Sequence, residues 1–232
     1  MNKINVVFCG YREWANSIFE IIEKHDNVCL KKTIRTIQEY KEFQERPTTT
    51  DIDLILFIGW SWIIPDYFTQ KYLCLGIHPS DLPQYRGGSP LQNQIIKGVI
   101  SSKVSLITLS SKLDAGDIWM KEDLSLIGDS IHNIFDNLIQ SSIILLNNFF
   151  NLYPNINPQM QETSTGSYFK RRKPEDSKLT LDDLNKMTLK ELYNFIRALT
   201  DPYPNAFIED EDGNKLVFKN VSYIPSKESK CH

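Results

Sequence analysis

Short apolar runs alternate with amphipathic segments through the first two thirds of the chain. An apolar run bounded by turn residues is typical of a buried strand, whereas apolar positions three and four residues apart are typical of a helix. Helices are predicted at 14–24, 90–98 and 131–153, the last being the longest helical pattern. The predicted strands are 4–9, 28–34, 54–59, 73–77 and 104–109. An opening strand, helix and strand predict an α/β fold with a parallel sheet.

The pattern changes after residue 153. The segment 154–167 is rich in Pro, Asn, Gln, Ser and Thr, which is typical of a linker. Thr188-Leu189-Lys190-Glu191 has the sequence of a capping box, so a helix is predicted from there to Leu199. Two short runs at 206–208 and 215–218 flank a turn sequence and predict a hairpin. The predicted organisation is a main domain at 1–153, a linker at 154–167, a small helix and hairpin subdomain at 168–224 and a disordered tail at 225–232.

Composition narrows the class of protein. A chain of 232 residues with 41% hydrophobic residues can bury one full core and has room for a small subdomain. Its net charge of -3 argues against a nucleic-acid or membrane partner, because either usually needs a basic surface. Cys9, Cys29, Cys74 and Cys231 lack metal-ligand spacing and are expected to be reduced thiols, and no metal is expected. Without a signal or membrane-spanning run, a cytoplasmic location is expected.

The main candidate site lies where the strand at 73–77 ends. His78 follows that apolar run directly, and the prolines and glycines after it do not favour a continued helix or strand. We therefore expect an ordered, irregular loop in which Asp81, Tyr85 and Arg86 can meet a ligand. A lone histidine at this position would more often be a core or turn residue.

Three other segments bear on whether His78 belongs to a binding site or is a core or turn residue. Trp60–Pro65 leaves the carboxyl end of a buried strand, where α/β sheets bind planar ligands, although both tryptophans could instead be core. Asp114 stands on a tight connection beside Ala115 and Gly116, where a surface turn would be the ordinary interpretation. Tyr168–Lys173 combines aromatic and basic residues and is either a solvated face or a grip for a base and a diphosphate.

Taken together, these motifs resemble the formyltransferases that use 10-formyltetrahydrofolate. The resemblance rests on the loop after 54–58, His-Pro-Ser-x-Leu-Pro-x-Tyr-Arg-Gly-Gly at 78–88, Leu-Asp-Ala-Gly-Asp-Ile at 113–118, Tyr-Phe-Lys-Arg-Arg at 168–172 and Arg-Ala-Leu-Thr-Asp-Pro-Tyr-Pro-Asn-Ala-Phe at 197–207. The family includes methionyl-tRNA formyltransferase and the enzymes that formylate nucleotide-linked amino sugars. The resemblance implies a Rossmann-like, mostly parallel sheet with helices on both faces, and 10-formyltetrahydrofolate as cosubstrate.

The resemblance also implies a role for individual residues. His78 and Asp114 would be catalytic. The donor would be bound by Ser61, Trp62, Ile63, Ile64, Asp114, Ala115 and Gly116. The acceptor would be bound by Ser80, Tyr85, Arg86, Gly87, Tyr168, Lys170, Arg171 and Arg172.

These residue types suit the chemistry of formyl transfer. When an amine attacks the formyl carbon, the oxygen becomes negative and the nitrogen must lose a proton. His78 can face the oxyanion, while Asp114 favours the imidazolium and can take the proton through water. The family's usual pattern is Asn-x-His, but Gly76 replaces the asparagine here, and losing one oxyanion donor typically costs about 2.7–4 kcal/mol. Asn93, Gln92, Ser61 or water could fill the gap.

The expected acceptor is the amine of a nucleotide-linked deoxysugar of the kind used for bacterial surface glycans. Little sequence follows the main domain, and its one basic cluster has the size of a diphosphate grip, whereas a tRNA needs many phosphate contacts. Three alternatives stay open: another amine such as methionyl-tRNA, hydrolysis of the formyl donor, or weakly active binding of folate or a sugar nucleotide. A homodimer is a further open alternative.

Overall fold

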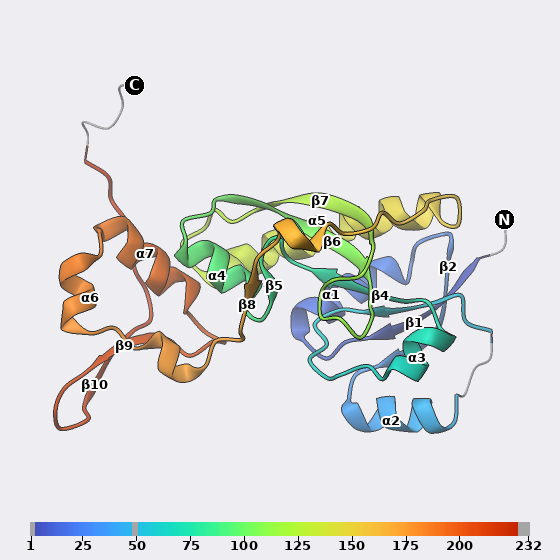
Figure 1. The fold of residues 1–232 in the computed structure, drawn as a ribbon, viewed down its shortest axis with the longest axis horizontal. Coiled ribbons are helices and arrows are strands. Elements are labelled where there is room, and N and C mark those ends of the chain that lie inside the picture. The colour runs from blue at the N-terminus through green and yellow to red at the C-terminus, as the bar shows by residue number, and fades with distance from the viewer. Residues whose placement is uncertain (1–2, 48–50, 227–232) are drawn as a thin grey trace.

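The computed structural model describes residues 3–47 and 51–226, and its centre is a six-stranded sheet (Figure 1). The strand order is β2-β1-β3-β4-β6-β7, in which the first four strands pair in parallel and the last two are antiparallel. The strands are β1 (Ile4–Cys9), β2 (Val28–Ile34), β3 (Leu54–Phe57), β4 (Cys74–His78), β6 (Ser101–Thr108) and β7 (Ile118–Ser125). The α/β fold class predicted from the sequence is confirmed.

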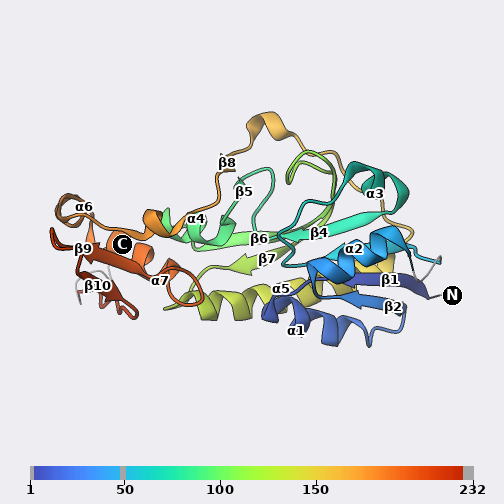
Figure 2. The same ribbon diagram turned by 90° about the horizontal axis from the view of Figure 1, so that it is seen from below.

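Helices cover both faces of this sheet, and each face has its own core (Figure 2). Side chains alternate along β1, so Phe8 points into one core and Val7 into the other. The first core is covered by α1 (Glu13–Ile22) and α5 (Ile131–Leu152), and the second by α2 (Ile37–Glu45) and α3 (Asp66–Lys71). The sheet is therefore buried on both sides, as its apolar strands require.

The strand β7 is not predicted from the sequence. It carries charged residues, Lys121, Glu122 and Asp123, and most of its positions are only half-buried. Its strand partner is β6, and apart from a single bridge at Ile118 its other side has no strand partner among the described residues, so it forms an edge of the sheet, where charged side chains are common and discourage further pairing. An edge strand of this kind lacks the apolar run by which the other strands were found.

The C-terminal elements lie together at one end of the molecule (Figure 1). The predicted helix and hairpin are confirmed, and a short helix, α6, precedes them. In the capping box, the Thr188 Oγ1 accepts from the Glu191 N–H at 3.2 Å, and the Glu191 Oε2 accepts from the Thr188 N–H at 2.8 Å. The elements are α6 (Leu181–Lys186), α7 (Leu189–Ala198), β9 (Ala206–Glu209) and β10 (Lys215–Phe218), with α7 packed on α4 (Pro90–Ile96).

The segment 154–167, predicted as a linker, runs against the main domain. Gln159 exchanges two backbone hydrogen bonds of 2.8 Å with Ile118. The segment then leads into β8 (Tyr168–Phe169), which pairs in parallel with β5 (Arg86–Gly87) (Figure 2). The loop at 78–88 was expected to be irregular throughout, so β5 is a correction: its strand partner comes from a distant segment. The division into domains stays a prediction. Residues 227–232, which make up most of the predicted tail and include Cys231, lie outside the described residues.

Candidate active site

A cleft of about 1490 Å³ opens where the parallel strands end. Carboxyl ends of neighbouring parallel strands meet at one edge of a sheet, so the turns that follow them converge there. The lining includes the turn after β1, the loop after β3, the end of β4, the connection before β7 and the basic residues that follow β8. Most of the predicted donor-binding and catalytic residues are therefore brought to one place.

His78 and Asp114 form a buried pair at this cleft. The His78 residue is 6% exposed, and its Nδ1 lies 3.5 Å from the Asp114 Oδ1, longer than an N–H···O hydrogen bond. Its other nitrogen, Nε2, lies 2.9 Å from the Tyr85 carbonyl oxygen, to which an Nε2–H can donate. The Asp114 Oδ2 accepts from the Gly87 N–H at 2.8 Å. With Nε2 engaged by the backbone, Nδ1 is the histidine nitrogen left for chemistry.

The loop after β3 is held by aromatic contacts. The Tyr11 hydroxyl donates to the Ser61 Oγ at 2.8 Å, and the Tyr11 ring centroid lies 4.5 Å from that of Trp62. Trp60 packs against the core beneath α2 and α3, whereas Trp62 is 36% and Ile63 90% exposed. Ser61, Trp62, Ile63 and Ile64 all line the cleft. Trp60 therefore both packs on the core and lines the cleft, and the four predicted donor-binding positions of this loop also line the cleft.

The two small residues after Asp114 serve the packing of the turn. Ala115 and Gly116 lie outside the lining of the cleft. A Cβ added at Gly116 would lie 1.8 Å from the Thr108 carbonyl oxygen, so only glycine allows the turn to approach β6 this closely. The close backbone approach at Gly116 is toward β6, and donor binding by Ala115 and Gly116 stays a prediction.

The predicted acceptor-binding residues divide into two groups. Gly87, Tyr168, Arg171 and Arg172 line the cleft, and Lys173 joins them. The other four lie outside the lining. Ser80 is fully buried and its Oγ donates to the Gln84 carbonyl at 2.7 Å, while the Tyr85 ring stacks on that of Phe169 with 5.2 Å between centroids. The Arg86 N–H donates to the Ser167 carbonyl at 2.9 Å, and Lys170 is exposed. Sequence proximity to His78 did not separate ligand-facing positions from those that shape the loop.

Arg172 is the cation most enclosed by the protein in this cluster. Burial lowers the pKa of its guanidinium, and the nearby Asp176 opposes that shift. Its backbone N–H donates to the Ser89 Oγ at 3.1 Å, while its guanidinium lies over the Phe195 ring at 5.6 Å. Within the described part of the chain its Nε is buried without a hydrogen-bond partner. A desolvated cation with an unused donor favours an anionic ligand nearby.

The space beside Gly76 is filled by an apolar side chain. A Cβ added there would lie 2.7 Å from a methyl carbon of Leu109. Of the three side chains considered as replacement donors, Ser61 accepts from Tyr11, and the Asn93 Nδ2 donates to the Gly88 carbonyl at 3.0 Å. Gln92 is 3% exposed and lines the cleft, and its Nε2 has no partner among the described residues. Among the described residues, the Ser61 hydroxyl and the Asn93 amide each keep one donor hydrogen, whereas the Gln92 amide keeps both.

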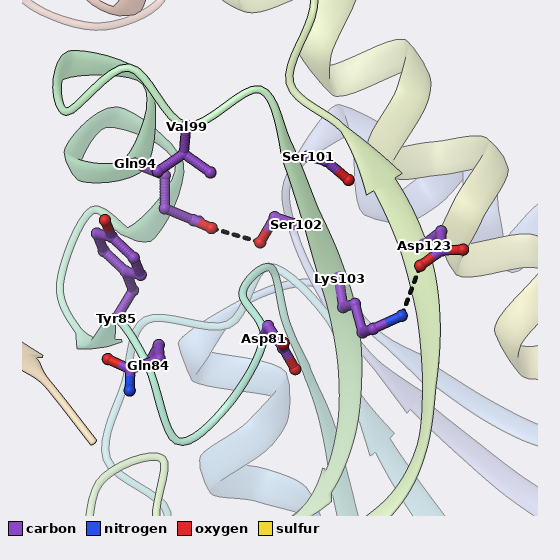
Figure 3. Close-up of a pocket in the computed structure, with 9 residues that line it drawn as sticks. All are labelled: Asp81, Gln84, Tyr85, Gln94, Val99, Ser101, Ser102, Lys103 and Asp123. Carbon is purple, nitrogen blue, oxygen red and sulfur yellow. Dashed lines mark hydrogen bonds and ion pairs between the residues drawn. The ribbon is translucent and has the colours of Figure 1, made fainter. Parts of the chain in front are cut away.

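A smaller cavity of about 280 Å³ is lined in part by the loop at 78–88, here called the catalytic loop (Figure 3). Four of its polar side chains are paired with one another: the Ser102 hydroxyl donates to the Gln94 Oε1, and Lys103 pairs with Asp123 at 2.5 Å. The Gln94 Nε2 donates to the Pro79 carbonyl at 2.8 Å and to the Pro90 carbonyl at 3.0 Å. This network fixes the backbone next to His78, and nothing in the local sequence pattern marked Gln94 for that role.

Comparison with known proteins identifies the family. Residues 12–140, more than half of the chain, match the formyl transferase family, and the chain belongs to it. The family predicted from the sequence motifs is confirmed.

Relatives of two kinds are similar to this chain. The methionyl-tRNA formyltransferase of Rickettsia canadensis is 36% identical over 166 residues, which are 69% of this chain and 52% of the relative. This chain thus spans about half the length of that curated relative. The structure of a methionyl-tRNA formyltransferase from Clostridium thermocellum is 32% identical with a TM-score of 0.77, covering 95% of this chain and 94% of that one. A sugar N-formyltransferase from a Shewanella strain shares the fold, at 18% identity and a TM-score of 0.75, covering 96% and 99%.

None of the helices in the described part of the chain has both the length and the apolar character that crossing a membrane requires.

Proposed function

We propose that this protein transfers a formyl group from 10-formyltetrahydrofolate to the amino group of a nucleotide-linked amino deoxysugar. One observation carries the proposal: the His78–Asp114 pair lies in a single cleft that is also lined by the apolar loop at 60–64 and by the basic residues 171–173. An acid–base pair with an apolar, aromatic surface and a cationic surface in one cleft suits a planar donor and an anionic acceptor.

The geometry accounts for the steps of the transfer. The acceptor nitrogen attacks the formyl carbon, and the electron pair of the C=O bond moves to oxygen. An Nδ1–H of His78 donates to this oxyanion, while the Asp114 carboxylate takes the proton that the attacking nitrogen loses, directly or through water. The C=O bond then re-forms, the bond to the folate nitrogen breaks, and that nitrogen leaves with the proton that Asp114 had taken, which restores the carboxylate. The Gly87 N–H occupies the Asp114 Oδ2, which leaves Oδ1 for the proton.

The donor side of the proposal rests on family membership and on the exposed apolar loop. Trp62 and Ile63 are more exposed than large apolar side chains usually are, and both line the cleft beside the catalytic pair. Burying them against a flat, largely apolar ring system would remove this surface from water. The pterin of 10-formyltetrahydrofolate is such a ring system.

The acceptor side rests on charge. The chain carries a net charge of -3, yet Arg171, Arg172 and Lys173 all line the cleft. The charged guanidinium of Arg172 suits a phosphate, and Tyr168, which is 57% exposed, offers a ring to a nucleobase. A diphosphate linked to a base and an amino sugar would use all of these groups.

A second acceptor class is favoured by a separate observation. The relative that is 36% identical over 166 residues is a methionyl-tRNA formyltransferase. We therefore propose charged initiator tRNA as the alternative acceptor for the same catalytic pair.

The test is to incubate the protein with 10-formyltetrahydrofolate and either a panel of nucleotide-linked amino sugars or charged initiator tRNA. We expect the mass gain of one formyl group on a sugar. The Arg172→Gln variant should raise the acceptor KM at least tenfold, on the order of one lost charge-assisted hydrogen bond. Lys186→Gln removes an equally positive but exposed side chain on α6 and is the matched control.

Each result decides between the candidates. Transfer to tRNA and to none of the sugars would overturn the proposed acceptor. Loss of the formyl group without any acceptor would identify a hydrolase. Failure of the donor to bind, measured by calorimetry with a stable folate analogue, would overturn the proposal as a whole.

A further inference from the structure

A side chain from the segment predicted as a linker holds the turn that carries Asp114. Gln161 is only 7% exposed, and its Nε2 donates to the Asp114 carbonyl at 3.1 Å and to the Gly116 carbonyl at 2.8 Å. An amide nitrogen has two hydrogens, so these two bonds use its full donor capacity. One side chain therefore grips the backbone on both sides of Ala115.

This backbone needs an external constraint. Asp114 has φ +50°, in the left-handed region that residues with a side chain seldom adopt. The carbonyl groups of Asp114 and Gly116 both point toward the same amide, and without a shared donor such dipoles would be left unpaired in a mostly buried place. Gly116 is also pressed against Thr108, so the turn has little room to relax on that side.

The position of this turn sets the position of the carboxylate. The Asp114 Oδ1 lies 3.5 Å from the His78 Nδ1, and Oδ2 accepts from the Gly87 N–H at 2.8 Å. Gln161 itself lies outside the lining of the cleft. We propose that Gln161 is a positioning residue, which acts through the Asp114 backbone to aim the catalytic carboxylate at His78 and Gly87. Its effect on turnover rests on the proposed function, whereas its effect on the geometry of Asp114 does not.

Packing alone gives no reason for an amide here. The Gln161 Oε1 is buried and has no hydrogen-bond partner among the described residues. A buried acceptor without a partner is unfavourable, and methionine, which has a similar length and no such acceptor, would remove that cost. Gln161→Met leaves two carbonyls without their donor but also removes the unpaired oxygen, so its melting temperature should fall by less than the loss of two hydrogen bonds would imply, and the variant should stay folded under assay conditions.

The kinetic test compares Gln161→Met with Gln159→Met. Gln159 lies two residues earlier on the same segment, its side chain is exposed, and its contact with Ile118 is through the backbone, so the substitution is matched. We expect kcat to fall about tenfold to a hundredfold in Gln161→Met, with KM for donor and acceptor changed by less than about threefold. Gln159→Met should keep its kcat. An unchanged kcat in a folded Gln161→Met, or a fall that occurs equally in Gln159→Met, would overturn the role.

A second measurement does not need turnover. The Gly87 amide donates to the Asp114 carboxylate, so its hydrogen exchange, followed by NMR on the uniformly labelled protein, reports where that carboxylate is. We expect Gly87 to exchange about fivefold to tenfold faster in Gln161→Met and at the wild-type rate in Gln159→Met. Unchanged Gly87 exchange would overturn the positioning role.

If the wild type formylates no acceptor, the proposed function fails while Gly87 exchange still decides this inference. If Gln161→Met does not fold, Gln161→Asn, which keeps the donor on a shorter side chain, takes its place in both measurements.

Discussion

Asp114 is held by groups from three separate segments, each of which constrains a different part of the residue. The Gly87 N–H binds one carboxylate oxygen, His78 faces the other, and Gln161 binds the backbone carbonyl. Because the Gly87 N–H already occupies Oδ2, the oxygen that can accept a proton is Oδ1, which lies beside the imidazole of His78. Its neighbours therefore decide how this residue can act.

Replacing Asp114 by asparagine should separate its charge from its structural contacts. In the Asp114→Asn variant the side-chain amide oxygen can still accept from the Gly87 N–H, so folding should be retained. Removing the proton acceptor should lower kcat by about two to four orders of magnitude. His78→Asn should have a similar effect, because it removes the group that faces the oxyanion. Circular dichroism and steady-state kinetics would check both, and near-wild-type turnover in either folded variant would refute that residue's role.

The substitution Gly76→Asn tests whether the site lacks an oxyanion donor. Alone it should destabilise the fold by about 1–3 kcal/mol, because its Cβ would meet a Leu109 methyl carbon at 2.7 Å. Combined with Leu109→Ala, which makes room, the new amide can reach the cleft. We expect kcat of the double variant to exceed that of Leu109→Ala by about tenfold, part of the usual value of one oxyanion donor. Equal kcat values would mean that another group, with Gln92 the first candidate, already serves the oxyanion.

At the scale of elements, β5 and β8 join the catalytic loop to the C-terminal part. Gly88 lies directly against the backbone of Arg171: a Cβ there would be 2.2 Å from the Arg171 Cα. The cations that line the cleft are thus attached to the loop at 78–88. In that loop the Tyr85 carbonyl contacts His78, and the Gly87 N–H donates to Asp114. Groups assigned to acceptor binding and to catalysis share one small, continuous piece of structure.

The capping boxes of α6 and α7 should make the C-terminal part sensitive to acid. The hydroxyl of Thr180 lowers the pKa of Asp183, and the backbone N–H of Thr188 lowers the pKa of Glu191. Because each pKa is lower in the folded state, the stabilisation is present above the unfolded pKa and is lost as the pH falls through the folded one. Both carboxylates are exposed, so the effect is small and screened by salt.

The double variant Thr180→Ala, Thr188→Ala checks this. It should be less stable at pH 7, because each helix loses its N-cap, at a typical cost of about 1 kcal/mol per cap. Its free energy of unfolding should also fall less steeply as the pH drops below the ordinary aspartate value of 3.8, because the variant loses the Thr180 hydroxyl that lowers the pKa of Asp183 but keeps the backbone N–H at position 188 that lowers the pKa of Glu191. Urea denaturation across a pH series measures both quantities. A slope identical to that of the wild type would show that these caps do not set the acid response.

At the scale of the whole molecule, charge separates the two acceptor classes. The protein is net negative, and Arg171, Arg172 and Lys173, the cations proposed to hold the acceptor, line the cleft. A sugar nucleotide held by two or three cations should lose only a few fold in affinity over a salt range in which a partner making about 6–10 phosphate contacts loses about 10³–10⁵. The acceptor KM measured at rising salt checks this. A steep dependence would favour the tRNA.

Local patterns in the sequence were enough for the parts of this protein that depend on neighbours along the chain. The apolar runs identified β1, β2, β3, β4 and β6, the helical spacing identified α5, and the capping box identified the start of α7. Each of these is specified within a few residues, because burial and capping act on consecutive positions. The motifs at 78–88 and 113–118 were likewise sufficient for the family and for the proposed catalytic pair.

Only the tertiary structure decided which distant groups meet. β7 is a strand because β6 offers it a partner, although its charged residues hide it from a hydrophobic pattern. Leu109 fills the space beside Gly76, and Gln161 grips the Asp114 turn from a segment whose composition is that of a linker. Ser80 looked available to a ligand and is instead buried within its loop. The contacts of Leu109 with Gly76 and of Gln161 with the Asp114 turn join residues more than thirty positions apart, so no local pattern of polarity can encode them.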